Sequence, residues 1–534
     1  MKKLPLGIQT FKEIIQGGYI YADKTQYVYN LINGMKCYFL SRPRRFGKSL
    51  LLDTINEVFN GDRELFKGLW LYDSDYDFEE HPVLRLDMSG IANETPEVLK
   101  TSISLALRTL SEKEGLPPIG DTPADIIKYL IQNLHDKYNK RVVVLIDEYD
   151  KPILDNIADL EIANANRQVV KRLYGILKPM DRYLRLTFIT GVSKFTKTSL
   201  FSELNNLLDI TMTEKYANIC GIAIEDLNRY FNEHIASLAS HDEFSKYSSL
   251  HDEILAWYDG YSWDGKTRVI NPFSLLSFLA QERFSSYWYA SGTPRFLLDM
   301  IKKRPEGYTD LMELDVSEWS LDSFDIQNIS AGPLLFQTGY LTVKEVLKNH
   351  TPATYRLSMP NREVRIAFNL HILSEFTEKE NPFAENIYRR IKDSLESGDL
   401  RSMLGSLKSL FASIPFQLHI GREAYYHSIF LALMNVLGFE VNAELSVSGG
   451  RIDATLELDD KVYVIEFKYN DCAPDATIDD KRVLFDILLD RAMAQIKDKG
   501  YAKRFAGSDK TVYQAAFAFL GRDDIDMRME TVYP

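Results

Sequence analysis

Cysteine is scarce in this sequence. The 534 residues contain three cysteines, Cys37, Cys220 and Cys472, which are odd in number and far apart. This usage argues against a disulfide framework and against a cysteine-based zinc site, and it suits a reducing compartment. The nine histidines never occur as H-E-x-x-H, so a histidine-based zinc site is not expected either. We therefore expect a cytoplasmic protein.

Long apolar runs and a positive net charge are also lacking. No run approaches the roughly 18 apolar residues that a membrane span needs, so no membrane partner is expected. The formal net charge of -13 argues against a general polyanion-binding surface, because duplex affinity depends mostly on lysine and arginine at phosphates. Nucleic acid would therefore bind at local patches. Two candidates are "RPRRFGK" (42–48) and "KDKGYAKRF" (497–505), and the second is better interpreted as a solvated helix face.

The composition itself is that of a folded soluble protein, with 45% hydrophobic and 26% charged residues. No low-complexity tract interrupts it. A chain of this length is too long for one hydrophobic core, so it should contain about two to four domains.

The stretch "SRPRRFGKSLLL" (41–52) is the first candidate site. Gly47, Lys48 and Ser49 match the end of the phosphate-loop pattern G-x-x-x-x-G-K-[ST], while Arg42 stands where the leading glycine should be. An apolar run precedes it and helical spacing follows it, which predicts strand, loop and helix. Backbone N–H groups and the helix N-terminus would then converge on phosphate, Lys48 would add charge, and Ser49 would hold magnesium. The alternative is a basic helix start without function.

Two further strands favour a nucleotide fold. "RVVVLIDEYDKP" (141–152) predicts a buried parallel strand ending in two carboxylates, at the sheet edge where open α/β sheets bind ligands. Asp147 would hold magnesium through water, and Glu148 would polarise the attacking water. "LRLTFITGVSKF" (184–195) ends in Thr190 and Ser193, which are placed to sense a γ-phosphate.

These segments, with "LPLGIQTFKEIIQGGYIYADKT" at the start, resemble the AAA-ATPase-like family of bacterial proteins. Members typically carry "RPRRFGK", so the missing glycine fits the family, and the resemblance extends nucleotide contact to Arg44, Arg45 and Phe46. It continues through "WYDGYSWDG", "NPFSLLSFL" and "YWYASGTPRFLL", where Arg295 matches a lid-domain sensor arginine. A simple helix start explains that last match equally well. We expect an ATPase core over 1–215 and a helical lid over 216–304.

The middle of the chain predicts two smaller elements. "GPLLFQTGYLTVKEV" followed by "TPATYRLSMPNREV" reads as a helix and a strand pair, which suggests a winged-helix-like module over 305–375. Such a module is compatible with DNA contact and equally with packing against the ATPase. Residues 376–414 are amphipathic and should form a helical connector.

The last segment carries a second candidate site. "VNAELSVSGGRIDATLELDDKVYVIEFKYN" (441–470) alternates like a hairpin, and a turn at Asp459 and Asp460 would place Asp453 opposite Glu466. Opposed Cβ atoms lie about 5 Å apart, so the two carboxylates could share a divalent cation. Lys468 would point to the same face.

Opposed like charges destabilise a sheet, and such a conflict with local stability is typical of a functional site. A bound magnesium could activate water and stabilise the departing oxyanion of a phosphodiester, with Lys468 positioning the nucleophile or neutralising charge. Glu423, on the preceding helix, would be a further metal-side carboxylate. The alternative is a solvated polar face.

This segment resembles the PD-(D/E)XK nuclease superfamily over 415–534. Carried over by position, Asp453, Glu466 and Lys468 match the catalytic core, Glu423 matches the helix acid, and Gln495 matches a polar residue on the following helix. The resemblance implies an α/β restriction-endonuclease-like domain that uses Mg²⁺, with Mn²⁺ as a substitute.

The expected fold is therefore α/β: a P-loop ATPase with parallel sheet, lid and winged-helix-like module, followed by a nuclease-like domain. The expected function is an ATP-binding and hydrolysing protein whose nucleotide state regulates a metal-dependent nuclease, with DNA favoured over RNA as substrate. The alternatives are a nucleotide switch or scaffold that binds nucleic acid or protein without cutting, and a protein that holds ATP with negligible turnover. Assembly into a homo-oligomer is compatible with the sequence, and no protein partner is identified.

Overall fold

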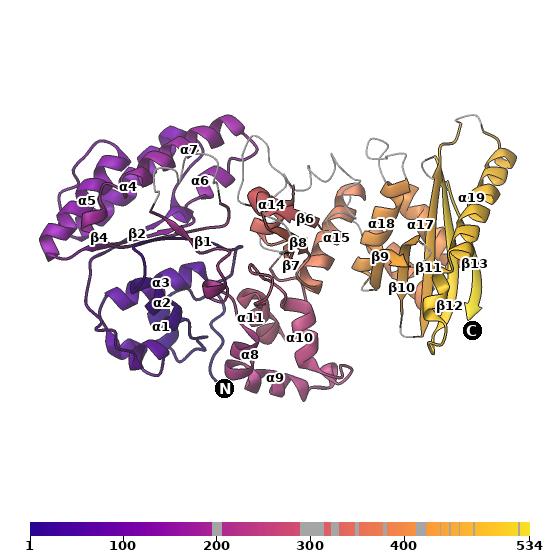
Figure 1. Ribbon diagram of the computed structural model, residues 1–534, viewed down its shortest axis with the longest axis horizontal. Helices are drawn as coiled ribbons and strands as arrows, with labels where there is room; N and C mark the ends of the chain where they lie inside the picture. Colours follow the sequence, from indigo (N-terminus) through magenta and orange to yellow (C-terminus); the bar gives the residue numbers. More distant parts are fainter. Residues whose placement is uncertain are drawn as a thin grey trace. The chain divides into compact units, whose positions relative to one another are not determined.

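The computed structural model describes most of the chain in two compact units (Figure 1). The described part of the first unit runs from Met1 to residue 288, with a gap at 195–205, and from 314 to Glu363; the second begins at Val364 and ends at 533. The described ranges are 1–194, 206–288, 314–321, 331–347, 352–377, 382–412, 423–437, 439–447, 450–458, 460–473, 476–521 and 524–533.

A parallel five-stranded sheet forms the centre of the first unit. Its order is β2-β3-β4-β1-β5, and every neighbouring pair is parallel. All residues of β1 and β3 are buried, as expected for strands covered on both faces. This confirms the predicted parallel sheet. The bounds are β1 Cys37–Ser41, β2 Val83–Asp87, β3 Val142–Asp147, β4 Leu184–Gly191 and β5 Leu208–Asp209.

Helices cover both faces of this sheet. In Figure 1, α4, α5 and α7 lie above it and α1, α2 and α3 lie below it. The long helices start where the sequence provides a cap: Thr95 and Thr122 each accept a backbone N–H, and a proline follows each at the first helical position. The bounds are α1 Phe11–Gln16, α2 Thr25–Ile32, α3 Lys48–Phe59, α4 Pro96–Lys113, α5 Pro123–Tyr138, α6 Lys151–Leu154 and α7 Leu160–Gly175, with 3₁₀ turns at Arg63–Phe66, Trp70–Asp73, Met88–Gly90 and Asp181–Tyr183.

The described part of the predicted lid is helical and has its own core. Phe278 and Phe284 stack with ring centroids 4.4 Å apart, and Tyr258 packs beside both. Arg295 lies outside the described residues, so its role as a lid arginine stays a prediction. The helices are α8 Ile224–Tyr230, α9 Asn232–Ala239, α10 Leu250–Tyr258 and α11 Pro272–Gln281, with 3₁₀ turns at Glu214–Tyr216 and Asp242–Phe244.

A small antiparallel sheet follows, in the order β6-β8-β7. The helix α14 and the strand pair β7 and β8 match the helix and strand pair expected from the sequence, whereas a winged-helix-like module stays a prediction. Thr342 exchanges hydrogen bonds with the backbone of Ser262, so this sheet packs within the first unit. The bounds are β6 Leu314–Ser317, α13 Glu318–Leu321, α14 Ala331–Thr338, β7 Thr342–Leu347 and β8 Thr354–Ser358.

The second unit is built on a mixed sheet in the order β13-β12-β11-β10-β9, in which only β11 and β12 are parallel. Figure 1 shows α19 on one face and α17 and α18 on the other. Among the described helices of the chain, none combines the length and apolarity of a membrane span. The bounds are α15 Arg362–Thr377, α16 Pro382–Ser397, α17 Leu400–Ala412, α18 Glu423–Val436, β9 Glu440–Val447, β10 Gly450–Glu457, β11 Lys461–Asn470, α19 Ile478–Asp498, a 3₁₀ turn Tyr501–Phe505, β12 Thr511–Leu520 and β13 Asp524–Tyr533.

Candidate functional sites

The loop between β1 and α3 turns sharply just before the helix. Gly47, the residue before α3, has a φ of 91°, and Arg45 has a φ of 67°. Glycine adopts this left-handed region without penalty, whereas a residue with a side chain stores strain there, a feature that clusters at functional sites. The strand, loop and helix expected from the sequence are all present, and the turn is made without a leading glycine.

Arg42, at the position of the missing glycine, is fully buried. Its Nη1 donates to the carbonyls of Ser41 (2.8 Å) and Thr211 (2.9 Å), and its Nη2 donates to that of Tyr216 (3.3 Å). The guanidinium lies 3.8 Å from the ring centroid of Trp263. The side chain therefore fastens the start of the loop to two distant segments, a role that the sequence did not predict.

Restoring the glycine pattern should damage the protein. Arg42→Gly removes three hydrogen bonds and leaves a cavity against Trp263, so the free energy of unfolding should fall by about 3 kcal/mol or more. Urea denaturation measures this change. Arg44→Gly in the same loop is the control, because Arg44 is exposed and its loss should cost less than about 1 kcal/mol. Equal stability of the two variants would contradict the role assigned to Arg42.

Lys48 is enclosed by its own loop. Its side chain is buried, and Nζ donates to the carbonyls of Arg42 and Pro43, both at 3.0 Å. Burial lowers the pKa of Lys48, and the charges of Asp147 and Glu148 oppose that effect. A buried ammonium that is held by neutral carbonyls gains by exchanging them for anionic oxygens. The lysine is therefore suited to bind phosphate.

A cavity of about 490 Å³ opens beside this loop, within the size range of small-molecule sites. Its polar wall includes the predicted residues Arg44, Arg45, Gly47, Lys48, Ser49 and Glu148. Its apolar wall comes from Pro5, Leu6, Ile8, Ile20, Phe231 and Phe273.

Phe46 and Arg45 are held in place by aromatic rings. Phe46 packs edge-on against Tyr261 and Trp263, with centroids 4.7 and 5.6 Å apart, and is buried. The guanidinium of Arg45 lies 4.1 Å from the ring centroid of Phe273. Phe46 therefore anchors the loop to the segment 257–265, whereas Arg45 covers an aromatic part of the cavity wall.

The carboxylates after β3 have different surroundings. Asp147 is buried and accepts a hydrogen bond from Thr190 Oγ1 at 2.6 Å. Glu148 has a left-handed backbone (φ 51°) and lies on the cavity wall, where burial raises its pKa and Lys48 opposes the shift. Only Glu148 therefore reaches the cavity directly, and Asp147 lies behind it.

The predicted phosphate sensors are not on the cavity wall. Thr190 is bonded to Asp147, and Ser193 is fully buried. The carboxylate of Asp150 accepts the backbone N–H of Val192 (3.0 Å) and of Ser193 (2.6 Å). The sequence did not predict this role of Asp150, which lies after β3 and holds the residues that follow β4. Burial raises the pKa of Asp150 to about 6. A nucleotide contact of Ser193 stays a prediction.

In the second unit, the hairpin has the register expected from the sequence. Ala454 pairs with Ile465 and Glu457 with Val462, and Leu458 N–H donates to Lys461 at 2.8 Å. Asp459, in the predicted turn, lies outside the described residues.

The hairpin ladder ends one position before the expected Asp453–Glu466 pair. Instead, Asp453 Oδ2 accepts the backbone N–H of Phe467 at 2.8 Å. The Asp453 carboxylate is thus held by a backbone N–H of the neighbouring strand and still lies close enough to Glu466 to repel it.

Glu466 and Lys468 form the centre of this site. Glu466 is 1% exposed; its Oε1 accepts from Lys468 Nζ at 2.8 Å, while Oε2 has no hydrogen-bond partner among the described residues. Burial and the charge of Asp453 raise the pKa of Glu466 to about 7, against the opposing effect of Lys468. A cation would satisfy this buried oxygen, which has no partner in the described part of the chain and lies beside a second carboxylate.

Glu423 and Gln495 border the same centre. Glu423 is the first residue of α18; its Oε2 accepts from Tyr469 N–H at 3.2 Å, and Oε1 lies 3.9 Å from Lys468 Nζ. Burial raises the pKa of Tyr501, its hydrogen bond with Gln495 opposes the shift, and the charges of Glu466 and Asp453 add to it. Printed contacts therefore link Glu466 and Lys468 to each other and Glu423 to Lys468, with Asp453 bound to the backbone of Phe467 beside them. A role of Gln495 at this site stays a prediction.

Magnesium fits part of this arrangement. Within the described residues, no group of three or more His, Cys, Asp or Glu side chains is arranged to hold a metal. Magnesium is usually bound through one or two carboxylates and completed by water and substrate phosphate. Asp453 and Glu466 meet that requirement, whereas Glu423 as a direct ligand stays a prediction.

The raised pKa of Glu466 predicts a response to pH. Its protonated form stabilises the fold below pH 4.5, and this stabilisation is lost as the pH rises through about 7. The affinity for metal should instead rise with pH, because the cation must displace the proton of Glu466. Manganese affinity from calorimetry should therefore be about tenfold higher at pH 8 than at pH 6. Equal affinity at both pH values would contradict this assignment, and Glu466→Gln should abolish the difference.

These features define a class: a P-loop ATPase-like unit joined to a PD-(D/E)XK nuclease-like unit. A family model described as "Predicted AAA-ATPase" matches residues 5–201, and a model of the PD-(D/E)XK nuclease superfamily matches 421–528. A protein of Azotobacter chroococcum mcd 1, named "Uncharacterized protein in vnfD 5'region", is 36% identical over 527 residues, or 97% of this chain and 96% of that protein. The chain belongs to this family of predicted AAA-ATPases with a C-terminal PD-(D/E)XK nuclease superfamily domain.

Two solved structures are also similar. The ORC2 protein of Aeropyrum pernix, in ADPNP–ADP complexes, is 13% identical, with 63% of this chain and 87% of that chain covered and a TM-score of 0.23. A chain of the Drosophila ORC bound to poly(dA/dT) DNA and Cdc6 is 11% identical, with 56% and 44% covered and a TM-score of 0.23. Scores this low carry no structural argument.

Proposed function

We propose that this protein binds and hydrolyses ATP and that its nucleotide state regulates a magnesium-dependent nuclease that acts on nucleic acid, with DNA favoured. The observation that carries the proposal is the presence of two candidate sites in one chain. One surrounds a 490 Å³ cavity with Lys48 on its wall, and the other centres on the buried Glu466–Lys468 pair. Both belong to superfamilies of enzymes.

In the first site, each residue has a distinct task. Lys48 would exchange the carbonyls of Arg42 and Pro43 for phosphate oxygens. Ser49 and Asp147 would hold Mg²⁺, which neutralises charge on the transferred phosphoryl group. Glu148 would accept the proton of the attacking water, because burial raises its pKa toward the range of a general base.

In the second site, Asp453 and Glu466 would hold Mg²⁺ or Mn²⁺, which lowers the pKa of water and stabilises charge on the phosphodiester. Lys468 Nζ donates to Glu466 Oε1 at 2.8 Å, which would leave Oε2 to bind the cation. Its ammonium can also neutralise the departing oxygen. Gln495 would orient the substrate through polar contacts.

A continuous set of contacts leads from the phosphate loop to the helix that enters the second unit. Trp288 Nε1 donates to the carbonyl of Arg44 at 3.0 Å, and its backbone N–H donates to Glu363 Oε1 at 2.8 Å. Glu363 is fully buried near the start of α15, which continues past the boundary of the first unit. A change in the loop would therefore reach α15 through one tryptophan.

Replacing that tryptophan should uncouple the two sites. Trp288→Phe keeps a ring but loses the indole donor to Arg44, so ATP affinity should change less than about threefold while the effect of ATP on cleavage disappears. Cleavage rates with ATP, ADP and no nucleotide measure the coupling. Trp70→Phe is the matched control, since Trp70 packs against Tyr29 and does not line the cavity. Unchanged ATP regulation in Trp288→Phe would contradict this route.

The whole proposal is tested by cleavage of a mixed DNA and RNA panel by the purified protein in Mg²⁺ or Mn²⁺, with ATP, ADP or no nucleotide. Cleavage that changes with nucleotide and vanishes in Asp453→Ala supports it and identifies the substrate. An absence of cleavage in every condition, with ATP binding demonstrated, overturns the nuclease part.

The second candidate is a nucleotide switch or scaffold that binds nucleic acid or protein without cutting. The net charge of -13 favours this candidate, because it argues against a general surface for binding polyanions. The expected result for this candidate is ATP-dependent binding of a partner with no metal-dependent cleavage.

A further inference from the structure

A second lysine lies on the wall of the proposed nucleotide cavity. Lys151 is the first residue of α6 and lines the same cavity as Lys48 and Glu148. Its charge lowers the pKa of Glu148, against the dominant effect of burial, so the two side chains are electrostatic neighbours. Lys48 begins α3, after the loop that follows β1, whereas Lys151 begins α6, after β3. The cavity therefore has cations on two different walls.

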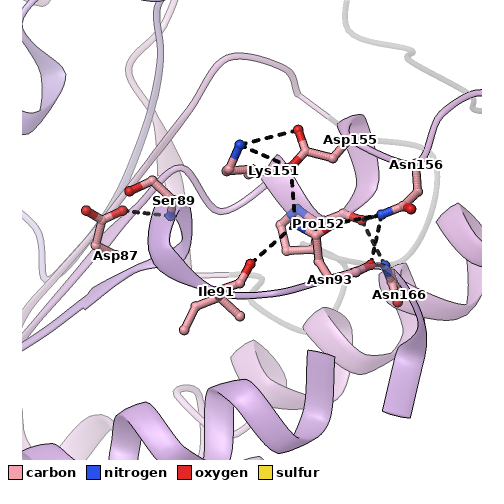
Figure 2. A network of polar contacts seen from close by, with 9 residues as sticks. All are labelled: Asp87, Ser89, Ile91, Asn93, Lys151, Pro152, Asp155, Asn156 and Asn166. Carbon is pink, nitrogen blue, oxygen red and sulfur yellow. Dashed lines mark hydrogen bonds and ion pairs between the residues drawn. The ribbon is translucent and has the colours of Figure 1, made fainter. Parts of the chain in front are cut away.

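A polar network holds Lys151 in this place (Figure 2). Lys151 Nζ lies 3.0 Å from Asp155 Oδ2, which also accepts from Asn93 Nδ2 at 3.1 Å. The backbone carbonyl of Asn93 accepts from Asn156 Nδ2 (2.9 Å) and Asn166 Nδ2 (2.7 Å). Both amides also donate to the carbonyl of Pro152, the residue after Lys151. The network thus ties α6 to α7 and to the segment after β2.

Asp155 does not depend on Lys151 alone. When the ammonium leaves, the carboxylate keeps its hydrogen bond from Asn93. The Lys151 and Asp155 side chains are 28% and 33% exposed, and an ion pair with that exposure is weak. Lys151 can therefore turn from Asp155 to an anion in the cavity without leaving a buried charge unpaired.

Three other cations of the cavity wall, Lys24, Arg45 and Lys48, are differently engaged, whereas the side chain of Arg44 is exposed. Lys24 forms an ion pair with Asp226 at 2.6 Å, and Arg45 covers the ring of Phe273. Lys48 Nζ is held by the carbonyls of Arg42 and Pro43, so it would reach the phosphates from the side of the loop. Lys151 stands beside Glu148, the residue proposed to act on the attacking water. Because that water attacks the terminal phosphate, the cation beside Glu148 faces the same phosphate.

We propose that Lys151 binds the terminal phosphate of a nucleoside triphosphate and so makes the cavity prefer ATP over ADP. This inference rests on the proposed nucleotide binding. In the exchange, Lys151 releases Asp155 and donates to a phosphate oxygen that ADP lacks. Asn93, Asn156 and Asn166 are positioning residues, since they hold the backbone of α6 rigid while the lysine side chain moves.

The test measures dissociation constants for ADP and for a non-hydrolysable ATP analogue in the full chain. Lys151→Met should weaken binding of the analogue at least about tenfold, the loss expected for a hydrogen bond to a charged group, and should leave ADP affinity within about twofold. Asp155→Asn should strengthen analogue binding, because it frees the lysine. Lys137→Met is the matched control, since Lys137 pairs with Glu114 outside the cavity, and it should change neither affinity.

Three outcomes decide the inference. A selective loss of analogue affinity in Lys151→Met supports it. Equal loss of both nucleotides, or no loss, overturns it while leaving nucleotide binding in place. If the unmodified protein binds neither nucleotide, the proposed ATPase function fails first and the role of Lys151 falls with it.

Discussion

Replacing Glu466 by glutamine should abolish metal-dependent cleavage, with a loss of at least about a thousandfold in rate. Glutamine has the same shape but cannot carry the negative charge that Oε2 presents beside Asp453. It also loses the ion pair with Lys468 at 2.8 Å, so both the metal and the lysine lose their anchor. Cleavage of the best substrate from the mixed panel measures the effect.

The fold should survive this change. Above pH 7 the ionised Glu466 is buried at a cost in free energy, because burial raises its pKa, and glutamine removes that cost. A thermal unfolding midpoint at pH 8 that is equal to or higher than that of the parent is therefore expected. Glu457→Gln on β10 is the matched control, since that carboxylate pairs with Lys510 at 3.7 Å and lies away from Asp453 in the ladder. Full activity of Glu466→Gln would contradict the assignment of this centre.

Replacing Lys48 by alanine should weaken nucleotide binding by about a hundredfold or more, because a buried ammonium that contacts phosphate contributes charge-assisted hydrogen bonds. The change also deprives the carbonyls of Arg42 and Pro43 of a donor, so unfolding free energy should fall by about 1–3 kcal/mol. Calorimetry with ATP and ADP measures binding, and both nucleotides should be affected alike.

The control for Lys48→Ala is Lys36→Ala. Lys36 pairs with Asp181 at 3.0 Å on the surface, just before β1, and takes no part in the cavity wall. Unchanged nucleotide affinity in Lys48→Ala would mean that the loop is a helix start without function, the alternative reading of its sequence.

Local patterns were enough to predict the elements that position both sites. Continuous apolar runs predicted the buried strands β1 and β3. A two-residue turn at Asp459 and Asp460 predicted the register of β10 and β11. Both families were also predicted from short motifs, and both are confirmed. These predictions succeeded because each depends on neighbours within one or two elements.

The sequence did not predict the contacts that side chains make outside their own element. Arg42 was seen as a missing glycine, yet its guanidinium binds carbonyls about 170 residues away and a ring 221 positions further along. Thr190 donates to Asp147 from the neighbouring strand, a contact that the sequence did not predict, and its role as a phosphate sensor stays a prediction. Asp453 left the ladder to accept a backbone N–H. No periodicity in the sequence records such contacts, because each is decided by tertiary packing.

Glu363 is the last residue of the first unit, and its buried carboxylate accepts a hydrogen bond from within that unit. Removing the chain from residue 364 onward would leave the carboxylate in place to accept the backbone N–H of Trp288. A truncation that also removes Glu363 would take away this acceptor and leave the buried backbone N–H of Trp288 unsatisfied. Independent folding of the first unit should therefore require the first two residues of α15, a helix that otherwise belongs to the second unit. Evolutionary exchange of the C-terminal half would be constrained at the same point.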